Sequence, residues 1–96
     1  MERLRRFDIA AHGTQLMVVV ESDLLPPDAA IVVIPLIADY PAVQRLNPAI
    51  RHDGRSYVLA TRLIAAVRRS ALRHVGSARS QADEITRAID ILLAGV

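Results

Sequence analysis

The sequence predicts a mainly β chain with some α structure, of the α+β class, in which an antiparallel sheet or small barrel packs with one C-terminal helix. Three observations predict it: two runs rich in β-branched residues, an Asp-Gly pair between strand-like arms, and a final amphipathic stretch. A chain of 96 residues is expected to form one domain, over residues 1–96. The hydrophobic fraction of 52% excludes a disordered chain.

The first two strands are expected over residues 14–21 and 31–37. The first reads TQLMVVVE, and its consecutive valines leave no polar face, so we predict a strand that is buried on both sides. The sequence Pro-Pro-Asp at 26–28 then indicates a turn. The run IVVIPLI follows as a second strand, in which Pro35 lacks an N–H group and is expected at an edge, a bulge or a bend.

The next element is a hairpin, within the sequence AIRHDGRSYVLAT. Asp53 and Gly54 lie between its two arms, as a type I′ turn requires, because both central residues of that turn need a positive φ. The segment from Leu63 to Val75 is ambiguous, since its apolar residues fit a helical spacing and short alternating strands almost equally well.

One amphipathic helix is predicted at the end of the chain. Ser80 is a suitable N-cap, with Asp83 at the capping-box position and Glu84 in the first turn, where a negative charge favours the helix dipole. Gly95 is a natural stop. One apolar stripe follows from the spacing of Ile85, Ala88, Ile89, Leu92 and Leu93.

A search for catalytic motifs finds none, so we expect neither an enzyme nor a metal or other cofactor. The chain has no cysteine, its glycines form no phosphate loop, and no serine has a nucleophile-elbow context. The spacing of His12, His52 and His74 matches no zinc motif, and each is interpreted as a surface histidine.

All 12 basic residues are arginine, and the formal net charge of +2 is too small to indicate a nucleic-acid-binding protein. Arg62, Arg68, Arg69 and Arg73 form the main basic cluster, which is interpreted as a solvated face rather than a docking surface. The start of the chain is unlike a signal peptide, and no apolar run reaches the roughly 20 residues that span a bilayer. We therefore expect a cytoplasmic protein with no membrane partner.

Four segments of the chain resemble the CcdB toxins of bacterial toxin–antitoxin modules. They read LMVVVESDLL, VVIPL, LNPAIRHDGRSYVLAT and ADEITRAIDILLAGV, in the order of that family and with nearly its spacing. The resemblance covers about four-fifths of the chain, from Leu16 to Val96.

The resemblance implies a homodimer with an SH3-like antiparallel barrel or sheet and a C-terminal helix. It also implies binding to the A subunit of DNA gyrase, so that the cleaved complex of gyrase with DNA is trapped. A CcdA-like antitoxin would neutralise the toxin, and the two would repress their own operon together, with the DNA contacted by the antitoxin alone. With this resemblance, the segment from Leu63 to Val75 is predicted to form short strands and a turn.

Residue by residue, the resemblance assigns gyrase binding to two places in this chain. The first is Leu24 and Leu25, after the ESD corner, and the second is the helix end, with Asp90, Leu93, Ala94, Gly95 and Val96. The best-known members end in Trp-Gly-Ile, whereas this chain ends in Ala94-Gly95-Val96. Ala94 therefore cannot stack on an arginine of the target, a cation–π contact worth about 0.5–2 kcal/mol.

Two alternative functions remain open. The first is a ribonuclease toxin, because the same barrel architecture also serves toxins that cleave mRNA, although no acid–base pair for that chemistry can be named from the sequence. The second is a degenerate member that dimerises and binds its antitoxin without harming the cell.

Overall fold

The computed structural model describes residues 3–95, and this part of the chain contains seven β-strands, three short 3-10 helices and one α-helix. The strands are β1 (Asp8–His12), β2 (Gln15–Val19), β3 (Ala30–Ile37), β4 (Ala49–His52), β5 (Arg55–Leu59), β6 (Ala65–Arg68) and β7 (Arg73–Ser77). The helices are η1 (Thr61–Leu63), η2 (Arg69–Ala71), η3 (Arg79–Gln81) and α1 (Ala82–Ala94).

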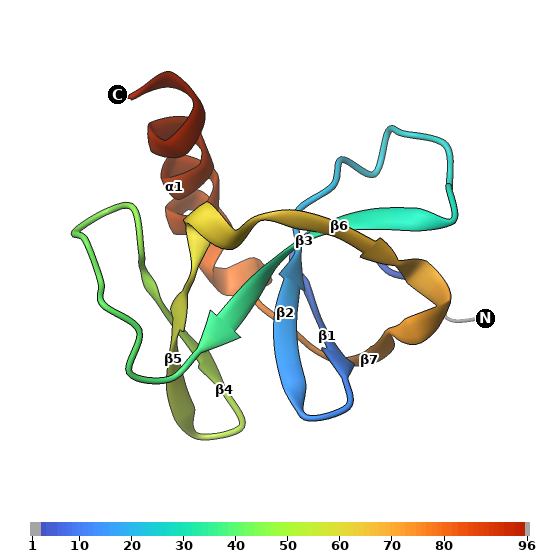
Figure 1. The fold of residues 1–96 in the computed structure, drawn as a ribbon, viewed down its shortest axis with the longest axis horizontal. Helices are drawn as coiled ribbons and strands as arrows, with labels where there is room; N and C mark the ends of the chain where they lie inside the picture. Colours follow the sequence, from blue (N-terminus) through green and yellow to red (C-terminus); the bar gives the residue numbers. More distant parts are fainter. Residues whose placement is uncertain (1–2, 96) are drawn as a thin grey trace.

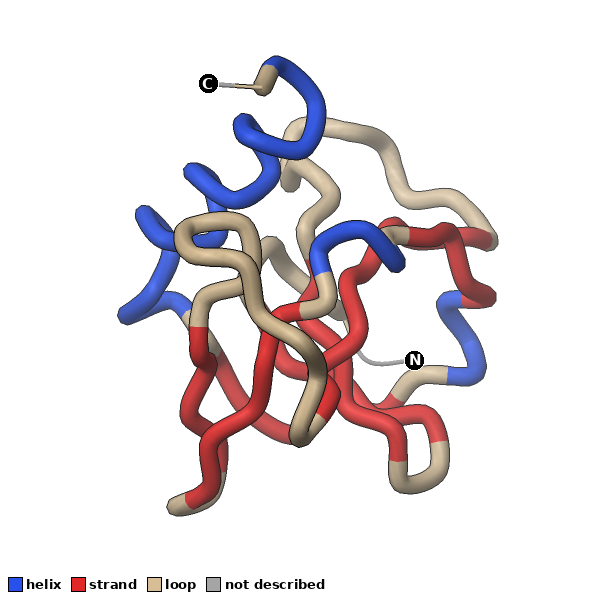
Figure 2. Tube along the Cα trace, turned by 60° about the vertical axis from the view of Figure 1, so that its left-hand side comes forward, coloured by secondary structure: helices blue, strands red, loops and turns tan. Residues whose placement is uncertain are grey.

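The strands form one antiparallel sheet in the order β4-β5-β3-β2-β1-β7, and β6 pairs with the first half of β3. The sheet curls into a half-barrel, and α1 stands at one side of it (Figure 1). Figure 2 shows the same curl from another side, with the helix along one flank. The predicted class is confirmed: the fold is an α+β, SH3-like half-barrel with one C-terminal helix.

The three central strands are buried on both faces, as predicted for the second of them. Successive side chains of a strand point to opposite faces, so β1, β2 and β3 supply two separate apolar clusters. The cluster that contains Ile9, Val18 and Ile34 also includes Ile85 and Ala88 of the helix. The other, which contains Ala10, Met17 and Val33, is joined by Val67 and Leu72 from the segment that folds over it.

Pro35 lies in the central strand β3, not at an edge of the sheet. It is opposite Met17 of β2, and its carbonyl accepts the backbone N–H of Ala60 at 3.0 Å, on the other side of the strand. The pairing of β3 with β6 ends at Val33, and the pairing with β5 begins at Leu36. Pro35 therefore lies between the part of β3 that pairs with β6 and the part that pairs with β5. At this position the sheet needs no hydrogen bond from the N–H group that proline lacks.

The two predictions for the middle of the chain are confirmed. Asp53 and Gly54 have φ values of 53° and 78° and join β4 to β5, as the type I′ turn requires. The segment from Leu63 to Val75 consists of short strands and a 3-10 turn, so the helical spacing of its apolar residues is not realised. The tertiary pairing of β6 with β3 and of β7 with β1 decides its structure.

The start of α1 differs from the prediction, whereas its end agrees with it. Ser80 lies within η3, and Gln81 occupies the N-cap position with no side-chain hydrogen bond to the helix, so the predicted Ser80 cap is wrong. Gly95 is the C-cap with φ 73°, and its N–H donates to the carbonyl of Ile91 at 2.9 Å. The left-handed conformation there favours glycine.

The side chain of Gln81 pairs with the outer edge of β4. Its Nε2 donates to the carbonyl of Ala49 at 2.6 Å, and its Oε1 accepts the N–H of Arg51 at 3.2 Å. The amide thus supplies the donor and the acceptor that a neighbouring strand would supply, and it covers an exposed sheet edge.

Replacing Gln81 by alanine is expected to lower the free energy of unfolding by about 1–2 kcal/mol, because two hydrogen bonds of about 0.5–1.5 kcal/mol each are lost. Urea unfolding followed by circular dichroism measures the change. Gln44→Ala, at an exposed loop position, is the matched control and should change stability by less than about 0.5 kcal/mol. Equal effects of the two substitutions would show that the edge contact contributes nothing.

Candidate functional site

Leu24 and Leu25 project from the loop between β2 and β3. Leu24 is 94% exposed and Leu25 56% exposed. Ser22 shapes the turn, because its Oγ accepts the N–H of Leu24 at 3.1 Å and its carbonyl accepts the N–H of Leu25 at 3.2 Å. Asp23 fixes the loop to the start of the chain by accepting the N–H of Arg6 at 2.8 Å. The loop therefore has a defined turn conformation and exposes two leucine side chains to solvent.

Arg69 secures both ends of this loop. Its guanidinium lies 3.5 Å from the carboxylate of Glu21, and both side chains are largely buried, with 13% and 14% exposed. Its Nε also donates to the carbonyl of Asp28 at 2.8 Å. Arg69 is therefore a structural residue and does not belong to the solvated basic face predicted for it, whereas Arg62, Arg68 and Arg73 are exposed on three different elements.

The end of α1 supplies the second group of predicted residues. Leu93 is 76% exposed, and Asp90, Ala94 and Gly95 are exposed beside it. Asp90, Leu93 and Ala94 share one face, because residues three and four apart are neighbours on a helix. The apolar stripe is correct for Ile85 and Ala88, which are fully buried, whereas Leu93 points to solvent. Val96 lies outside the described residues.

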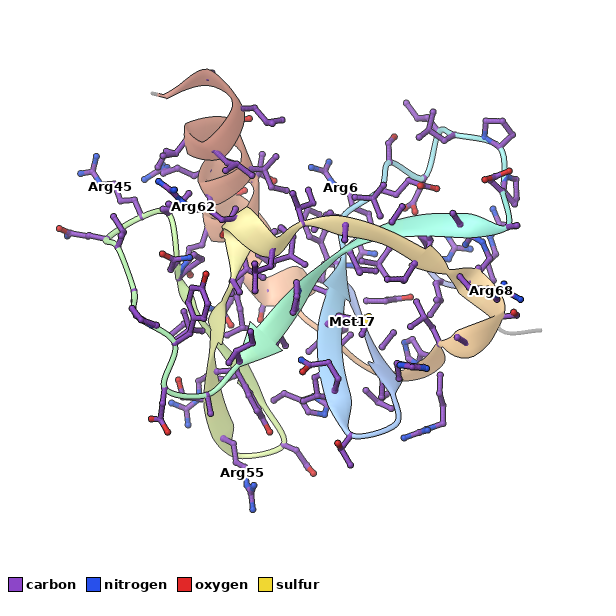
Figure 3. The ribbon with its side chains drawn as sticks, viewed as in Figure 1. Arg6, Met17, Arg45, Arg55, Arg62 and Arg68 are labelled. Carbon is purple, nitrogen blue, oxygen red and sulfur yellow. The ribbon has the colours of Figure 1, made fainter. Side chains whose placement is uncertain are left out.

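The two groups stand on the same side of the molecule without forming one continuous patch. The loop and the helix end both lie at the upper side in Figures 1 and 2. We call Leu24, Leu25, Asp90, Leu93, Ala94 and Gly95 together the leucine surface. Figure 3 places Arg6, which the sequence analysis did not single out, between its two parts. The guanidinium of Arg6 lies 4.7 Å from the centre of the Phe7 ring, and no sequence motif marks this cation.

Two of the three histidines have defined neighbours. His52 is half-buried and packs against Gly76, where an added Cβ would lie 2.9 Å from the imidazole Cε1. His74 lies with its Nε2 3.7 Å from the Asp8 carboxylate, which also accepts the N–H of Arg5 at 2.8 Å. The interpretation as a surface histidine is therefore wrong for the half-buried His52, whereas His12 and His74 are exposed as expected.

Within residues 3–95, no three His, Asp or Glu side chains gather closely enough to hold a metal ion. No helix in the same range is long and apolar enough to cross a membrane.

These features define a class of protein: a small SH3-like half-barrel with one C-terminal helix that exposes leucines from a loop and from the helix end. The family model described as CcdB protein matches residues 6–95. The chain therefore belongs to the CcdB family, the toxins of toxin–antitoxin modules.

A solved structure shares this fold. It is described as an endoribonuclease in complex with its cognate antitoxin from a mycobacterial species, and the match has a TM-score of 0.75. The alignment covers 95% of this chain and 95% of that chain, at 15% sequence identity, so the likeness concerns the fold alone. No curated protein matches the chain significantly in sequence.

Proposed function

We propose that this protein is a toxin that binds the A subunit of DNA gyrase through the leucine surface and traps the cleaved gyrase–DNA complex. Membership of the CcdB family supports the proposal. The observation that carries it is the exposure of Leu24, Leu25 and Leu93 on one side of the molecule. Large apolar side chains that are exposed to solvent lose that exposure when another protein covers them, so their exposure favours a protein contact on this side.

The arrangement suits an interaction that needs no chemistry on the toxin itself. The backbone that carries the leucines is held by hydrogen bonds in the loop and at the helix end, which reduces the conformational entropy that is lost when a partner covers them. Asp90 and Arg6 add one negative and one positive charge, which can set the orientation of the partner. In this proposal the protein is not an enzyme and holds no cofactor, and it traps the target by contact alone.

The proposal includes a homodimer and an antitoxin. Strand β6 pairs with β3 on one side only, and it carries the exposed Ala65 and Ala66, which makes its other edge a candidate for contact between two copies. The fold match to a toxin bound to its antitoxin supports a CcdA-like partner. That antitoxin would contact the operator DNA during joint repression of the operon. We expect the protein to act in the cytoplasm, without a membrane partner.

The direct test is a gyrase cleavage assay with the purified protein and supercoiled plasmid. We expect linear DNA to accumulate after denaturation of the enzyme, because a trapped complex holds both strands broken. The control is Leu24→Asp, which places a charge at the most exposed leucine and should remove the effect without unfolding the protein. Intact plasmid with the wild-type protein would contradict the proposal.

Cleavage of RNA is the second candidate function, because the solved structure that shares the fold is described as an endoribonuclease. RNA cleavage commonly uses a general acid and a general base within reach of the substrate. His74 and Asp8 are residue types that such chemistry uses, and the His74 Nε2 lies 3.7 Å from the Asp8 carboxylate. Degradation of RNA that His74→Ala abolishes would support this function. A chain that acts on neither gyrase nor RNA would be the degenerate member, which only dimerises and binds antitoxin.

A further inference from the structure

A groove lies between the ends of two hairpins, at the end of the molecule opposite the leucine surface. The β1–β2 and β4–β5 turns both stand at the lower side in Figures 1 and 2, whereas the helix end and the leucine loop stand at the upper side. The groove has a volume of about 680 Å³ and is lined from three directions: by the two turns and by β7. The groove is open to solvent, and its lining is mainly polar.

The charge of the groove is mainly positive. Arg55 and Arg73 are exposed on its rim, and neither forms an ion pair with another described residue. Figure 3 shows Arg55 at the lower edge, pointing away from the protein body. Asp53 is the one carboxylate among the lining residues. Two guanidinium groups beside one groove suit the phosphates of a polyanion, because each can donate two parallel hydrogen bonds to phosphate oxygens.

Two rings add surfaces on which flat groups can stack. His52 is held in place because Gly76 has no Cβ, so the imidazole rests against the backbone of β7. Tyr57 is half-buried in the same groove. Proteins that bind single-stranded nucleic acid combine aromatic rings with a positive groove, because the rings can stack on the faces of the bases. In a duplex these faces are already stacked on neighbouring bases.

The remaining polar groups suit RNA better than DNA. The Asp53 carboxylate would repel a phosphate, but it can accept a hydrogen bond from a ribose 2′-hydroxyl, which deoxyribose lacks. The hydroxyl of Thr14, on the opposite turn, can donate or accept such a bond. The groove also offers few contacts to the apolar side chains of a peptide, because Leu16 and Val75 are its larger aliphatic lining residues and both are half-buried.

We propose that this groove binds a short segment of single-stranded RNA, with Arg55 and Arg73 on its phosphates and Tyr57 and His52 against its bases. The site is a binding site, not a site of cleavage: His74 and Asp8 are outside its lining. It is also separate from the leucine surface, so its occupancy and gyrase binding can be tested independently.

The test is fluorescence anisotropy with a labelled oligouridylate, recorded over a series of salt concentrations. We expect saturable binding that weakens as salt rises, because bound phosphates release counterions. Arg55→Gln and Arg73→Gln should each weaken binding several-fold and lower the slope of the logarithmic salt plot by about 0.7, the value for one phosphate contact on a single strand. Tyr57→Leu should weaken binding at least about fivefold through lost stacking.

The matched control is Arg62→Gln, which removes the same charge from the exposed η1 segment at the upper side (Figure 3). It should leave both the affinity and the salt slope unchanged, and the melting temperatures of all variants show whether each is folded. Equal losses in Arg62→Gln and in the groove variants would overturn the proposal in favour of unspecific charge attraction. The proposal would also be overturned by equal binding of oligodeoxythymidylate or duplex RNA, by tighter binding of polyglutamate, or by no binding of the oligouridylate at low salt.

Discussion

Deletion of Gly95 and Val96 is expected to abolish toxicity while the protein remains folded. The helix end is exposed, and Gly95 contributes one cap hydrogen bond, so we expect a loss in unfolding free energy of about 1 kcal/mol or less. If these residues belong to the contact with gyrase, their loss removes a central part of the interface. Such a loss commonly costs about 2 kcal/mol or more, which corresponds to about a 30-fold weaker complex.

Growth of cells that express the deletion variant, together with gyrase cleavage and thermal unfolding of the purified protein, measures these expectations. His12→Ala is the control, because His12 is exposed on the β1–β2 hairpin, far from the leucine surface, and should leave toxicity unchanged. A deletion variant that unfolds would show that the terminus belongs to the core. A variant that stays fully toxic would show that the terminus is not a contact.

Ile85→Ala is expected to have the largest effect on stability. Ile85 is fully buried and joins α1 to the cluster of Ile9, Val18 and Ile34. Truncation of a buried isoleucine to alanine costs about 2–5 kcal/mol, since apolar contacts are lost and a cavity remains. In a domain of this size, each kcal/mol lowers the melting temperature by about 4–8 °C.

The matched control for this substitution is Leu93→Ala on the same helix. Leu93 is 76% exposed, so its truncation should change stability by less than about 0.5 kcal/mol and instead weaken gyrase binding. Thermal unfolding of both variants is measured at the same protein concentration, because the melting temperature of a protein that dimerises depends on its concentration. Similar losses of stability in the two variants would contradict the assignment of Ile85 to the core and of Leu93 to the surface.

Local rules predict well where a few neighbouring residues decide the conformation. Asp53-Gly54 needs only its own backbone preferences to turn the chain, and Gly95 ends the helix for the same reason. The double-sided burial of β2 follows from its consecutive valines. Strand β1 was not predicted, although Gly13, with φ 60°, joins it to β2 in a tight turn. Its sequence DIAAH has few β-branched residues, so the pairing with β2 and β7 determines this strand.

In the candidate site, too, some residues could be assigned from the sequence and others could not. The resemblance to CcdB toxins assigned gyrase binding to the residues of the leucine surface, because its motifs are continuous in the sequence, and that role stays a prediction. The position of Arg6 and the hairpin groove could not be predicted, since their residues come from segments that only the folded sheet brings near one another.

The sequence by itself determined the α+β class, the hairpin turn, the C-terminal helix with its glycine stop, and the family. These depend on side-chain period and on backbone preferences that act over a few residues. The local pattern left the segment from Leu63 to Val75 ambiguous, and the strands predicted there by the resemblance form through tertiary pairing. Only the tertiary structure decided the place of Pro35 between two partners and the edge contact of Gln81. The physical reason is that a backbone hydrogen bond between distant strands can outweigh the weak local preference of either segment.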